Sequence, residues 1–425
     1  MAKIPVPFDG VRYDLGNQLG ACAVMSVEPS VISQRTLLLC AAAALFEGFD
    51  NQSIGVAAPQ LALEFALSPS QKGLIFSAAP VGLFIGAMVG GRAADYLGRK
   101  RVLTTSLLLL GLCSLLTAIA SGAPSLAAAR LLTGLGLGGA MPNFIALTSE
   151  SARAGRRLTA GTIVMAGMPM GGALASLIAI SGSHGWGWRT IFYVGGAAPI
   201  ALALIMGFLL PARPAMGGVV TPRVESMASA LFSAGRAGTT LLLWGGFFFT
   251  QLVLLLMLNW LPSLVVGLGL TRAQAGWCAV IFNLSGSLGA TLLGPLHAGK
   301  RRRHWVLITY VGIAFALVAM AGVRHSFTWA ALACGVAGCF IIGAQLILFA
   351  FAPLYYGRTT RGTGVGTAVA VGRLGSVVGP LLAAVLLAGG GTSATVLLGI
   401  VPFVAIAGAA AMGLSWREQC ADFDA

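Results

Sequence analysis

The sequence predicts an all-α membrane protein with twelve transmembrane helices, arranged as two pseudo-symmetric halves of six helices each. Of its 425 residues, 57% are hydrophobic and only 9% are charged, against about 25% charged in an ordinary soluble domain. The apolar residues gather in long runs, and a weak repeat relates the first half of the chain to the second. This composition excludes a soluble enzyme with a normal surface.

Twelve apolar runs follow one another along the chain. A helix that spans a bilayer needs about 20 residues, and each run is close to that length or longer. The runs are apolar on all sides, whereas a transmembrane strand alternates over about ten residues, so we predict helices. The runs cover residues 36–58, 73–94, 102–122, 126–150, 158–182, 191–210, 239–267, 273–298, 305–323, 328–355, 363–388 and 394–413.

The second and the eighth of these runs have matching starts. Ser68-Pro69-Ser70-Gln71 precedes one run, and Thr271-Arg272-Ala273-Gln274 precedes the other, 203 residues later. A Ser or Thr followed three residues on by Gln is typical of the capping box that begins a helix, and Pro69 suits the first helical position. The two starts therefore indicate related helices.

The same shift of 203 residues aligns other positions, such as Gly86 with Gly289 and Gly161 with Gly364. The longest link between runs is rich in Pro, Gly and Ser and separates six runs from six. Two such halves imply a substrate site at their interface near mid-membrane, with transport by rocking of one half against the other. We predict an N-terminal tail over 1–35, a first half over 36–210, a linker over 211–238, a second half over 239–413 and a C-terminal tail over 414–425.

The basic residues indicate how the helices are oriented. Twenty Lys and Arg residues fall on the side that holds both termini, and four fall in the loops of the other side. Loops rich in Lys and Arg stay in the cytoplasm, so we predict that both termini are cytoplasmic. The net charge of +14 is then a topology signal, and we expect no nucleic-acid partner.

The loop after the second run combines an acid, a glycine and a basic cluster. It reads Gly91-Arg92-Ala93-Ala94-Asp95-Tyr96-Leu97-Gly98-Arg99-Lys100-Arg101. Asp95 and the cluster can hold two helix ends together by charge-assisted hydrogen bonds and release them in another state. A plain positive-inside loop would explain the basic cluster but neither Asp95 nor Gly98. In the second half Ala298 stands where the acid would be, so any charge latch there must differ, and we assign no latch role to Ala298.

The fourth run is dense in glycine. Gly134, Gly136 and Gly139 formally match a dinucleotide-binding fingerprint, but that fingerprint needs a preceding strand and a polar helix start, and neither is predicted here. Small residues let neighbouring transmembrane helices approach closely. We therefore expect these glycines, and the ladder from Gly82 to Gly90 in the second run, to serve helix packing.

Two acids, Glu47 and Asp50, stand in the middle of the first run. An ionisable residue at mid-bilayer costs about 2.5–3.5 kcal/mol on insertion scales, and residues three apart lie on about the same helix face. Asp50 lies about 12 Å, and Arg130 about 6–9 Å, from the outer ends of their helices, so we predict that they meet. A carboxyl beside an Arg can be ionised and paired in one environment and protonated in another, and proton coupling requires such a change. The alternative is that the acid and the Arg form a buried pair that serves packing alone.

Arg373 stands about ten residues, or about 15 Å, inside the eleventh run, and no acid occurs in the last six runs to pair with it. A guanidinium is a planar fork that matches a carboxylate. We therefore predict that Arg373 binds a carboxylate of the substrate. The alternative is an Arg that snorkels to the cytoplasmic surface.

These motifs resemble those of the major facilitator superfamily, through the loop from Gly91 to Arg101 and the stretch from Arg130 to Asn143. Within it the chain is similar to the aromatic acid:proton symporter family, on Glu47-Gly48-Phe49-Asp50, Asn259-Trp260-Leu261-Pro262 and Gly372-Arg373-Leu374-Gly375. Glu47 and the Ala-Leu-Thr-Ser-Glu stretch that ends at Glu150 are most like the hydroxyphenylpropionate transporter branch.

The resemblance implies the major facilitator fold and the uptake of an aromatic carboxylate, such as a hydroxyphenylpropionate or a hydroxybenzoate, with protons. It implies a bacterial inner membrane, and we expect a monomer with no metal and no cofactor beyond the proton. For proton coupling it implies Asp50, Glu47 and Arg130. For substrate binding it implies Arg373, Arg130, Asn259, Trp260 and Phe46, and for gating Asp95, Gly98, Arg99 and Glu150.

Two other functions remain open from the sequence. A facilitator that exports drugs, or carries sugars or aliphatic acids, would share the fold and the loop motif. A membrane-embedded enzyme would need a nucleophile or a metal cluster inside the bilayer, and the sequence offers no such His, Cys and Asp grouping.

Overall fold

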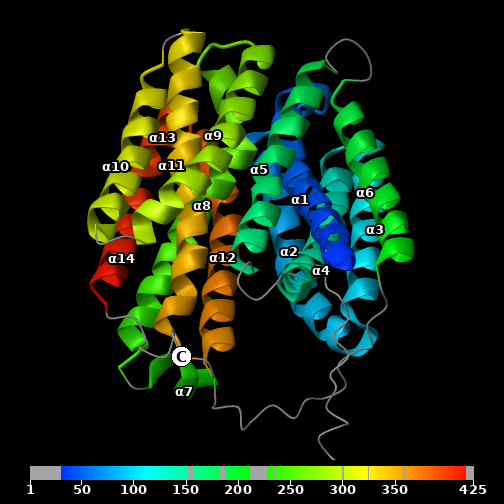
Figure 1. Cartoon of the computed structure of the whole chain (residues 1–425). Coiled ribbons are helices and arrows are strands. Elements are labelled where there is room, and N and C mark those ends of the chain that lie inside the picture. The colour runs from blue at the N-terminus through cyan, green and yellow to red at the C-terminus, as the bar shows by residue number, and fades with distance from the viewer. Residues whose placement is uncertain are drawn as a thin grey trace, which may run out of the picture.

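The computed structural model describes residues 30–151, 157–181, 187–210, 227–233, 235–298, 301–323, 325–357 and 360–417. Every regular element in these ranges is a helix, as the sequence predicts. Figure 1 shows two groups of long helices side by side, one running from blue to green and the other from green to red. The all-α prediction is therefore confirmed.

The first group contains six helices, which correspond to the first six apolar runs. They are α1 (Ser30–Glu64), α2 (Pro69–Leu97), α3 (Arg99–Ala118), α4 (Ala123–Ser151), α5 (Arg157–Ser181) and α6 (Arg189–Leu209). Between the groups, residues 211–226 lie outside the described ranges, and the predicted linker also contains a short helix, α7 (Met227–Phe232).

The second group contains the last six apolar runs. They form α8 (Ala237–Gly267), α9 (Arg272–Ala298), α10 (Arg302–Ala321), α11 (Phe327–Phe351) with the 3-10 turn η3 (Ala352–Tyr355), α12 (Arg361–Ala388), α13 (Ser393–Gly399) and α14 (Val401–Trp416). The last run is a single apolar span of 24 residues. It is split into α13 and α14 at Ile400, just before the proline near the start of α14, because proline lacks the N–H that would continue the helix.

Among the described residues, eleven helical segments are long and apolar enough to cross a membrane, and α1 is not one of them. At 35 residues, α1 is about 52 Å long and so has ample length. Its middle carries Glu47 and Asp50, which reduce its apolar character. Because α1 packs against α4, α5 and α6 inside the first group, we count it as the twelfth span.

Glycines set the contact between α2 and α4. A Cβ added to Gly86 would lie 2.2 Å from the carbonyl oxygen of Leu135, and one added to Gly134 would lie 2.0 Å from that of Ala79. Gly289, the repeat partner of Gly86, meets the carbonyl oxygen of Cys339 in the same way, at 2.2 Å, between α9 and α11. The glycines thus serve close helix packing, and the repeat reproduces that packing in both halves.

The two predicted capping boxes are present. Ser68 accepts a hydrogen bond from the Gln71 N–H at 3.2 Å while the Gln71 side chain accepts one from the Ser68 N–H at 2.9 Å. Thr271 and Gln274 make the same two bonds, at 3.3 and 2.9 Å. These starts fix where α2 and α9 begin, and their agreement supports the predicted relation between the halves.

The two groups of helices pack on each other through α1 with α8, α2 with α12, and α5 with α9. The contacts lie toward the end of the bundle that holds the α1–α2 and α8–α9 connections, which we call the distal end. There the hydroxyl of Ser77 donates to the carbonyl oxygen of Val377 at 2.8 Å, and Phe76 packs edge-on against Trp260 with ring centroids 5.1 Å apart. The opposite end, where α1 starts and α14 ends, is called proximal below.

Candidate functional site

Asp50 on α1 and Arg130 on α4 form a buried, bidentate ion pair. The two guanidinium nitrogens of Arg130 donate to the two carboxylate oxygens of Asp50 at 2.9 and 2.7 Å, and both side chains are almost fully buried. The contact that the depth of the two residues predicts is therefore confirmed. Arg130 also lies over the ring of Phe192, 6.0 Å from its centroid.

Glu47 lies one helical turn before Asp50 but does not share its partner. Its side chain is 1% exposed, and neither carboxylate oxygen has a hydrogen-bond partner among the described residues. The charge that acts on it most strongly is that of Arg373, from the other half of the bundle. Of the two acids of α1, Asp50 thus has an ion-pair partner, whereas Glu47 has no hydrogen-bond partner in the described part of the chain; the sequence alone did not indicate this difference.

A cavity of about 700 Å³ lies between the halves, beside these groups. Its walls come from α1, α4 and α5 on one side and from α8, α9, α11 and α12 on the other. The apolar lining includes Met141, Met165, Met168, Leu254 and Phe349. The polar lining includes Asn51, Gln251, Asn283, Gln345 and Arg373. An apolar pocket with a few convergent polar groups is what a small organic ligand requires.

Arg373 is the charged group in the cavity wall, and it is half-buried. Its Nη2 donates to the sulfur of Met141 at 2.7 Å, across the interface between the halves. A thioether is a weak acceptor, so a carboxylate would be a much better partner for this guanidinium. The structure therefore brings Arg373 to a place where it can bind an anionic ligand.

Amide groups join the halves on the distal side of the cavity. The Asn283 amide donates to Gln52 Oε1 at 3.1 Å, and the Gln52 amide donates to the carbonyl oxygen of Leu258 at 3.0 Å. Gln52 is on α1, whereas Leu258 and Asn283 are on α8 and α9. These buried bonds close the distal side of the cavity in this conformation.

Three residues that the resemblance implies for substrate binding do not line the cavity. Asn259 donates to the carbonyl oxygen of Leu255 in its own helix at 3.0 Å. Trp260 donates to the carbonyl oxygen of Pro380 at 3.1 Å and packs in the distal contact. Phe46 packs against the core of the first half. Leu258, one residue before Asn259, does line the cavity, so Asn259 and Trp260 lie near its distal edge on other faces of α8.

Of the predicted latch, the structure describes mainly the turn. Gly98 ends α2 and precedes α3, and its N–H donates to the Ala94 carbonyl oxygen at 3.0 Å. Its φ of 84° lies in the left-handed region that favours glycine. The Arg99 side chain is half-buried, whereas the side chains of Asp95 and Glu150 lie outside the described part of the chain, so the latch stays a prediction.

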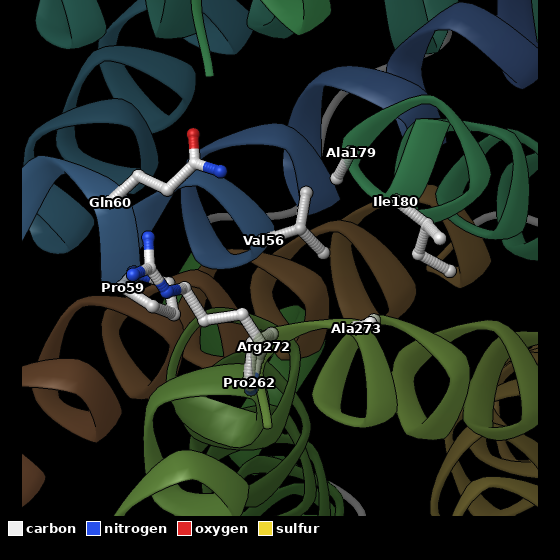
Figure 2. Close-up of a pocket in the computed structure, with 9 residues that line it drawn as sticks. Val56, Pro59, Gln60, Ala179, Ile180, Pro262, Arg272 and Ala273 are labelled. Carbon is white, nitrogen blue, oxygen red and sulfur yellow. The ribbon is translucent and has the colours of Figure 1, made fainter. Parts of the chain in front are cut away.

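A second, smaller pocket of about 440 Å³ lies at the distal end. Figure 2 shows Arg272 of α9 extended toward Pro59 of α1, with Val56 on the same helix as Pro59 and Ile180 of α5 on the far side of Val56. Gln60 and Arg272 also border the surface beside Glu64, whose carboxylate accepts hydrogen bonds from Arg189 at 2.6 and 3.1 Å and from Trp188 at 2.6 Å. The Arg189 hydrogen bond, followed by that of Trp188, lowers the pKa of Glu64.

Sequence reasoning missed the glutamines of the cavity wall. Gln251 stands inside the apolar run 239–267 and Gln345 inside the run 328–355. A search for ionisable residues in the runs passes over them because an amide carries no charge. A search for any amide within a predicted span would have found both, and would also have found Gln52.

Two bundles of six helices around a central cavity, with an arginine in its wall, define the architecture of a membrane transporter. The sequence model of the Major Facilitator Superfamily matches residues 40–380. The chain belongs to this superfamily, and it is a transporter, not an enzyme.

Three comparisons place the chain within this fold. It is 43% identical over 401 residues to the 3-(3-hydroxyphenyl)propionate transporter of Escherichia coli, with 93% of this chain and 98% of that one covered. It is 34% identical over 375 residues to the gallate transporter of Pseudomonas putida, with 81% and 84% covered. The chain also matches the crystal structure of a bacterial homologue of the human lysosomal transporter Spinster, in an inward-facing and unoccupied conformation. The TM-score is 0.74 at 17% identity, and the match covers 91% of this chain and 97% of that one. This likeness shows the fold.

Proposed function

We propose that the protein carries an aromatic carboxylate, such as a hydroxyphenylpropionate or a hydroxybenzoate, into the cell together with protons. The observation that carries this proposal is Arg373 in the wall of a mainly apolar cavity, with the sulfur of Met141 as its hydrogen-bond acceptor. The relatives named above transport 3-(3-hydroxyphenyl)propionate and gallate. Both are aromatic carboxylates, and both suit a cavity with a mainly apolar lining and one guanidinium.

Binding of the carboxylate to Arg373 would displace Met141 as its partner. Two parallel N–H···O bonds to a carboxylate are stronger than a bond to a thioether, because the acceptor is charged and matches the fork. The aromatic ring would then lie among Met165, Met168 and Phe349, since sulfur and ring edges make favourable contacts with an aromatic face. Met141 and Arg373 come from different halves, so the ligand would replace a contact between them.

The proton would be taken up by Glu47. While the cavity is empty, Arg373 supplies the charge that acts on the Glu47 carboxylate. A substrate carboxylate on Arg373 would neutralise that charge and leave Glu47 buried with neither a hydrogen bond nor a counter-charge, which is costly. Binding of a proton removes this cost, so substrate and proton would enter together. Asp50, held by Arg130 in a bidentate pair, would keep α1 and α4 together and could relay the proton to Glu47.

The predicted orientation suggests which conformation this structure represents. With both termini in the cytoplasm of a bacterium, the proximal end would face inward; because Gln52 and Asn283 join the halves at the distal side, we propose an inward-facing state. Rocking of the halves would break these amide bonds and open the cavity to the outside. The turn at Gly98, with Asp95, Arg99 and Glu150, would then latch the proximal end. We propose a functional monomer in the inner membrane, because the two halves of one chain together enclose the cavity.

The test is uptake by purified protein in liposomes under an imposed inward proton gradient. Labelled benzoate, 3-phenylpropionate and their ring-hydroxylated forms should accumulate, whereas a sugar and an aliphatic monocarboxylate should not. The accumulation should collapse when a protonophore is added. Accumulation of none of the aromatic acids, with transport of a sugar or a drug instead, would replace this proposal by that of a facilitator for another solute.

A further inference from the structure

Two glutamines in the cavity wall have amide oxygens without a hydrogen-bond partner. Gln251 on α8 and Gln345 on α11 are 8% and 6% exposed, and the Oε1 atom of each lacks a partner among the described residues. Both line the cavity that contains Arg373. Buried polar atoms are almost always hydrogen-bonded in native proteins, so these two indicate a place where a ligand supplies the missing partner.

The packing of α12 on α8 places Gln251 distal to Arg373. A Cβ added to Gly375 would lie 2.1 Å from the carbonyl oxygen of Phe248, so Gly375 and Phe248 are at about the same depth. The two helices run parallel, and Arg373 precedes Gly375 by two residues. Arg373 is therefore about level with Phe248 or just proximal to it. Gln251 follows Phe248 by three residues, or about 5 Å along the axis. Gln251 therefore lies about one helical turn further from the proximal end than Arg373 does.

The packing of α11 on α8 brings Gln345 to a similar level. A Cβ added to Gly246 would lie 3.4 Å from Leu348, and α11 runs antiparallel to α8. Gln345 precedes Leu348 by three residues, so it is shifted about 5 Å in the distal direction. Gln251 and Gln345 thus face one cavity from two helices, at about the same depth and about one turn distal to Arg373.

We infer that Gln251 and Gln345 bind a ring hydroxyl of the substrate and so select hydroxylated aromatic carboxylates over unhydroxylated ones. This inference rests on the proposed function. A phenolic hydroxyl both donates and accepts, so it can pair with a glutamine amide in either orientation. One helical turn is also the length scale of one aromatic ring, so a carboxylate on Arg373 and a hydroxyl between the glutamines can be reached by one molecule.

The amides favour a hydroxyl over a second anionic group. An unpartnered amide oxygen repels a carboxylate but accepts from an O–H donor. A ligand without the hydroxyl would leave both oxygens buried and unpaired, and sites built to hydrogen-bond a hydroxyl discriminate strongly against analogues that lack it. The glutamines therefore determine specificity, whereas Arg373 binds the carboxylate that all these acids share.

The test compares two pairs of probes on the purified full-length protein in nanodiscs. The first pair is 3-(3-hydroxyphenyl)propionate and 3-phenylpropionate, and the second is gallate and benzoate. The variants are Gln251→Met, Gln345→Met and the double substitution, because methionine keeps the length of glutamine and removes its amide. Gln60→Met is the matched control, since Gln60 lines the distal pocket and not the cavity. The melting temperature without ligand shows that each variant is folded.

The wild type and Gln60→Met should bind the hydroxylated acid of each pair at least about tenfold more tightly than the unhydroxylated one, as a ratio of Kd values. Each single variant should reduce this ratio by about fivefold, and the double variant should bring it near one while binding the unhydroxylated acid at least as well as the wild type. An unchanged ratio in the folded double variant would overturn the inference and leave the proposed function intact. If the wild type bound neither acid of either pair, the proposed function itself would fall.

Discussion

The Arg373 guanidinium of the second half donates a hydrogen bond to the sulfur of Met141 in the first half, across the central cavity. Glu47 is buried, and its carboxylate has no hydrogen-bond partner among the described residues. Asp50 and Arg130, by contrast, satisfy each other. In the proposed mechanism, Arg373 binds the substrate and Glu47 takes up the proton, whereas the Asp50–Arg130 pair has a supporting role.

Replacing Arg373 should impair binding and leave folding intact. In Arg373→Gln the charge-assisted bonds to the substrate carboxylate are lost, which are worth about 1.5–3 kcal/mol each, so the affinity for 3-(3-hydroxyphenyl)propionate should fall at least about tenfold. Isothermal titration calorimetry on purified protein measures this. Arg272→Gln at the distal surface is the control and should bind normally; equal affinities in all three proteins would place the carboxylate elsewhere.

Replacing Asp50 should affect the stability of the protein. Asp50→Asn leaves Arg130 buried without its counter-charge, and breaking one side of a buried ion pair costs about 3–5 kcal/mol. We expect a lower melting temperature than in the wild type and a loss of proton-driven uptake. The paired substitution of Asp50→Asn with Arg130→Gln should recover part of the stability, because it removes both charges. A single variant as stable as the wild type would show that the pair contributes little to the fold.

Glycines in the contact between α2 and α4 should not tolerate a side chain. In Gly86→Val the added atoms meet the carbonyl oxygen of Leu135, where even a Cβ would lie at 2.2 Å. Overpacking of this kind costs about 1–3 kcal/mol or more, so thermal unfolding in detergent should begin at a lower temperature. Gly161→Ala on α5 serves as a control, because a Cβ there meets no atom of the described residues within 4 Å. Equal melting temperatures for the two variants would contradict the packing described.

The Glu64–Arg189 pair at the distal surface should stabilise the protein only above acidic pH. The hydrogen bond from Arg189 lowers the pKa of Glu64 below its ordinary value of 4.5. The stability that the pair contributes is therefore complete above pH 4.5, and it is lost as the pH falls through the pKa that Glu64 has in the folded protein. Both side chains are more than a third exposed, so the contribution should be about 1 kcal/mol or less. The melting temperatures of the wild type and Glu64→Gln should differ at pH 7 and converge toward pH 3; a gap that widens on acidification would refute this.

Much of the fold follows from the sequence, because the signals that specify it are local. Apolar length determines the spans, the capping boxes at Ser68 and Thr271 determine two helix starts, and glycine spacing determines the contact between α2 and α4. The split of the last span at Ile400 lies beside a proline that the sequence shows, although proline is tolerated within several other helices here. Whether such a proline breaks a helix depends on packing, which sequence alone does not provide.

The site is less predictable, because it depends on which helix faces which. The contact of Asp50 with Arg130 follows from their depths in the membrane. The contact of Met141 with Arg373 does not, because it requires the relative placement of two halves that are far apart in the sequence. For the same reason Asn259 and Trp260, which lie on the helix that carries Gln251, were predicted to bind the substrate but do not line the cavity.

The most direct test of the account measures how substrate affinity changes with pH. If Glu47 binds one proton when the substrate carboxylate takes Arg373, the Kd of the wild type for 3-(3-hydroxyphenyl)propionate should rise with pH, by up to about tenfold per pH unit for one linked proton. In Glu47→Gln the Kd should be nearly independent of pH between 6 and 9, and the variant should exchange substrate without accumulating it. A variant whose Kd keeps the pH dependence of the wild type would contradict the account.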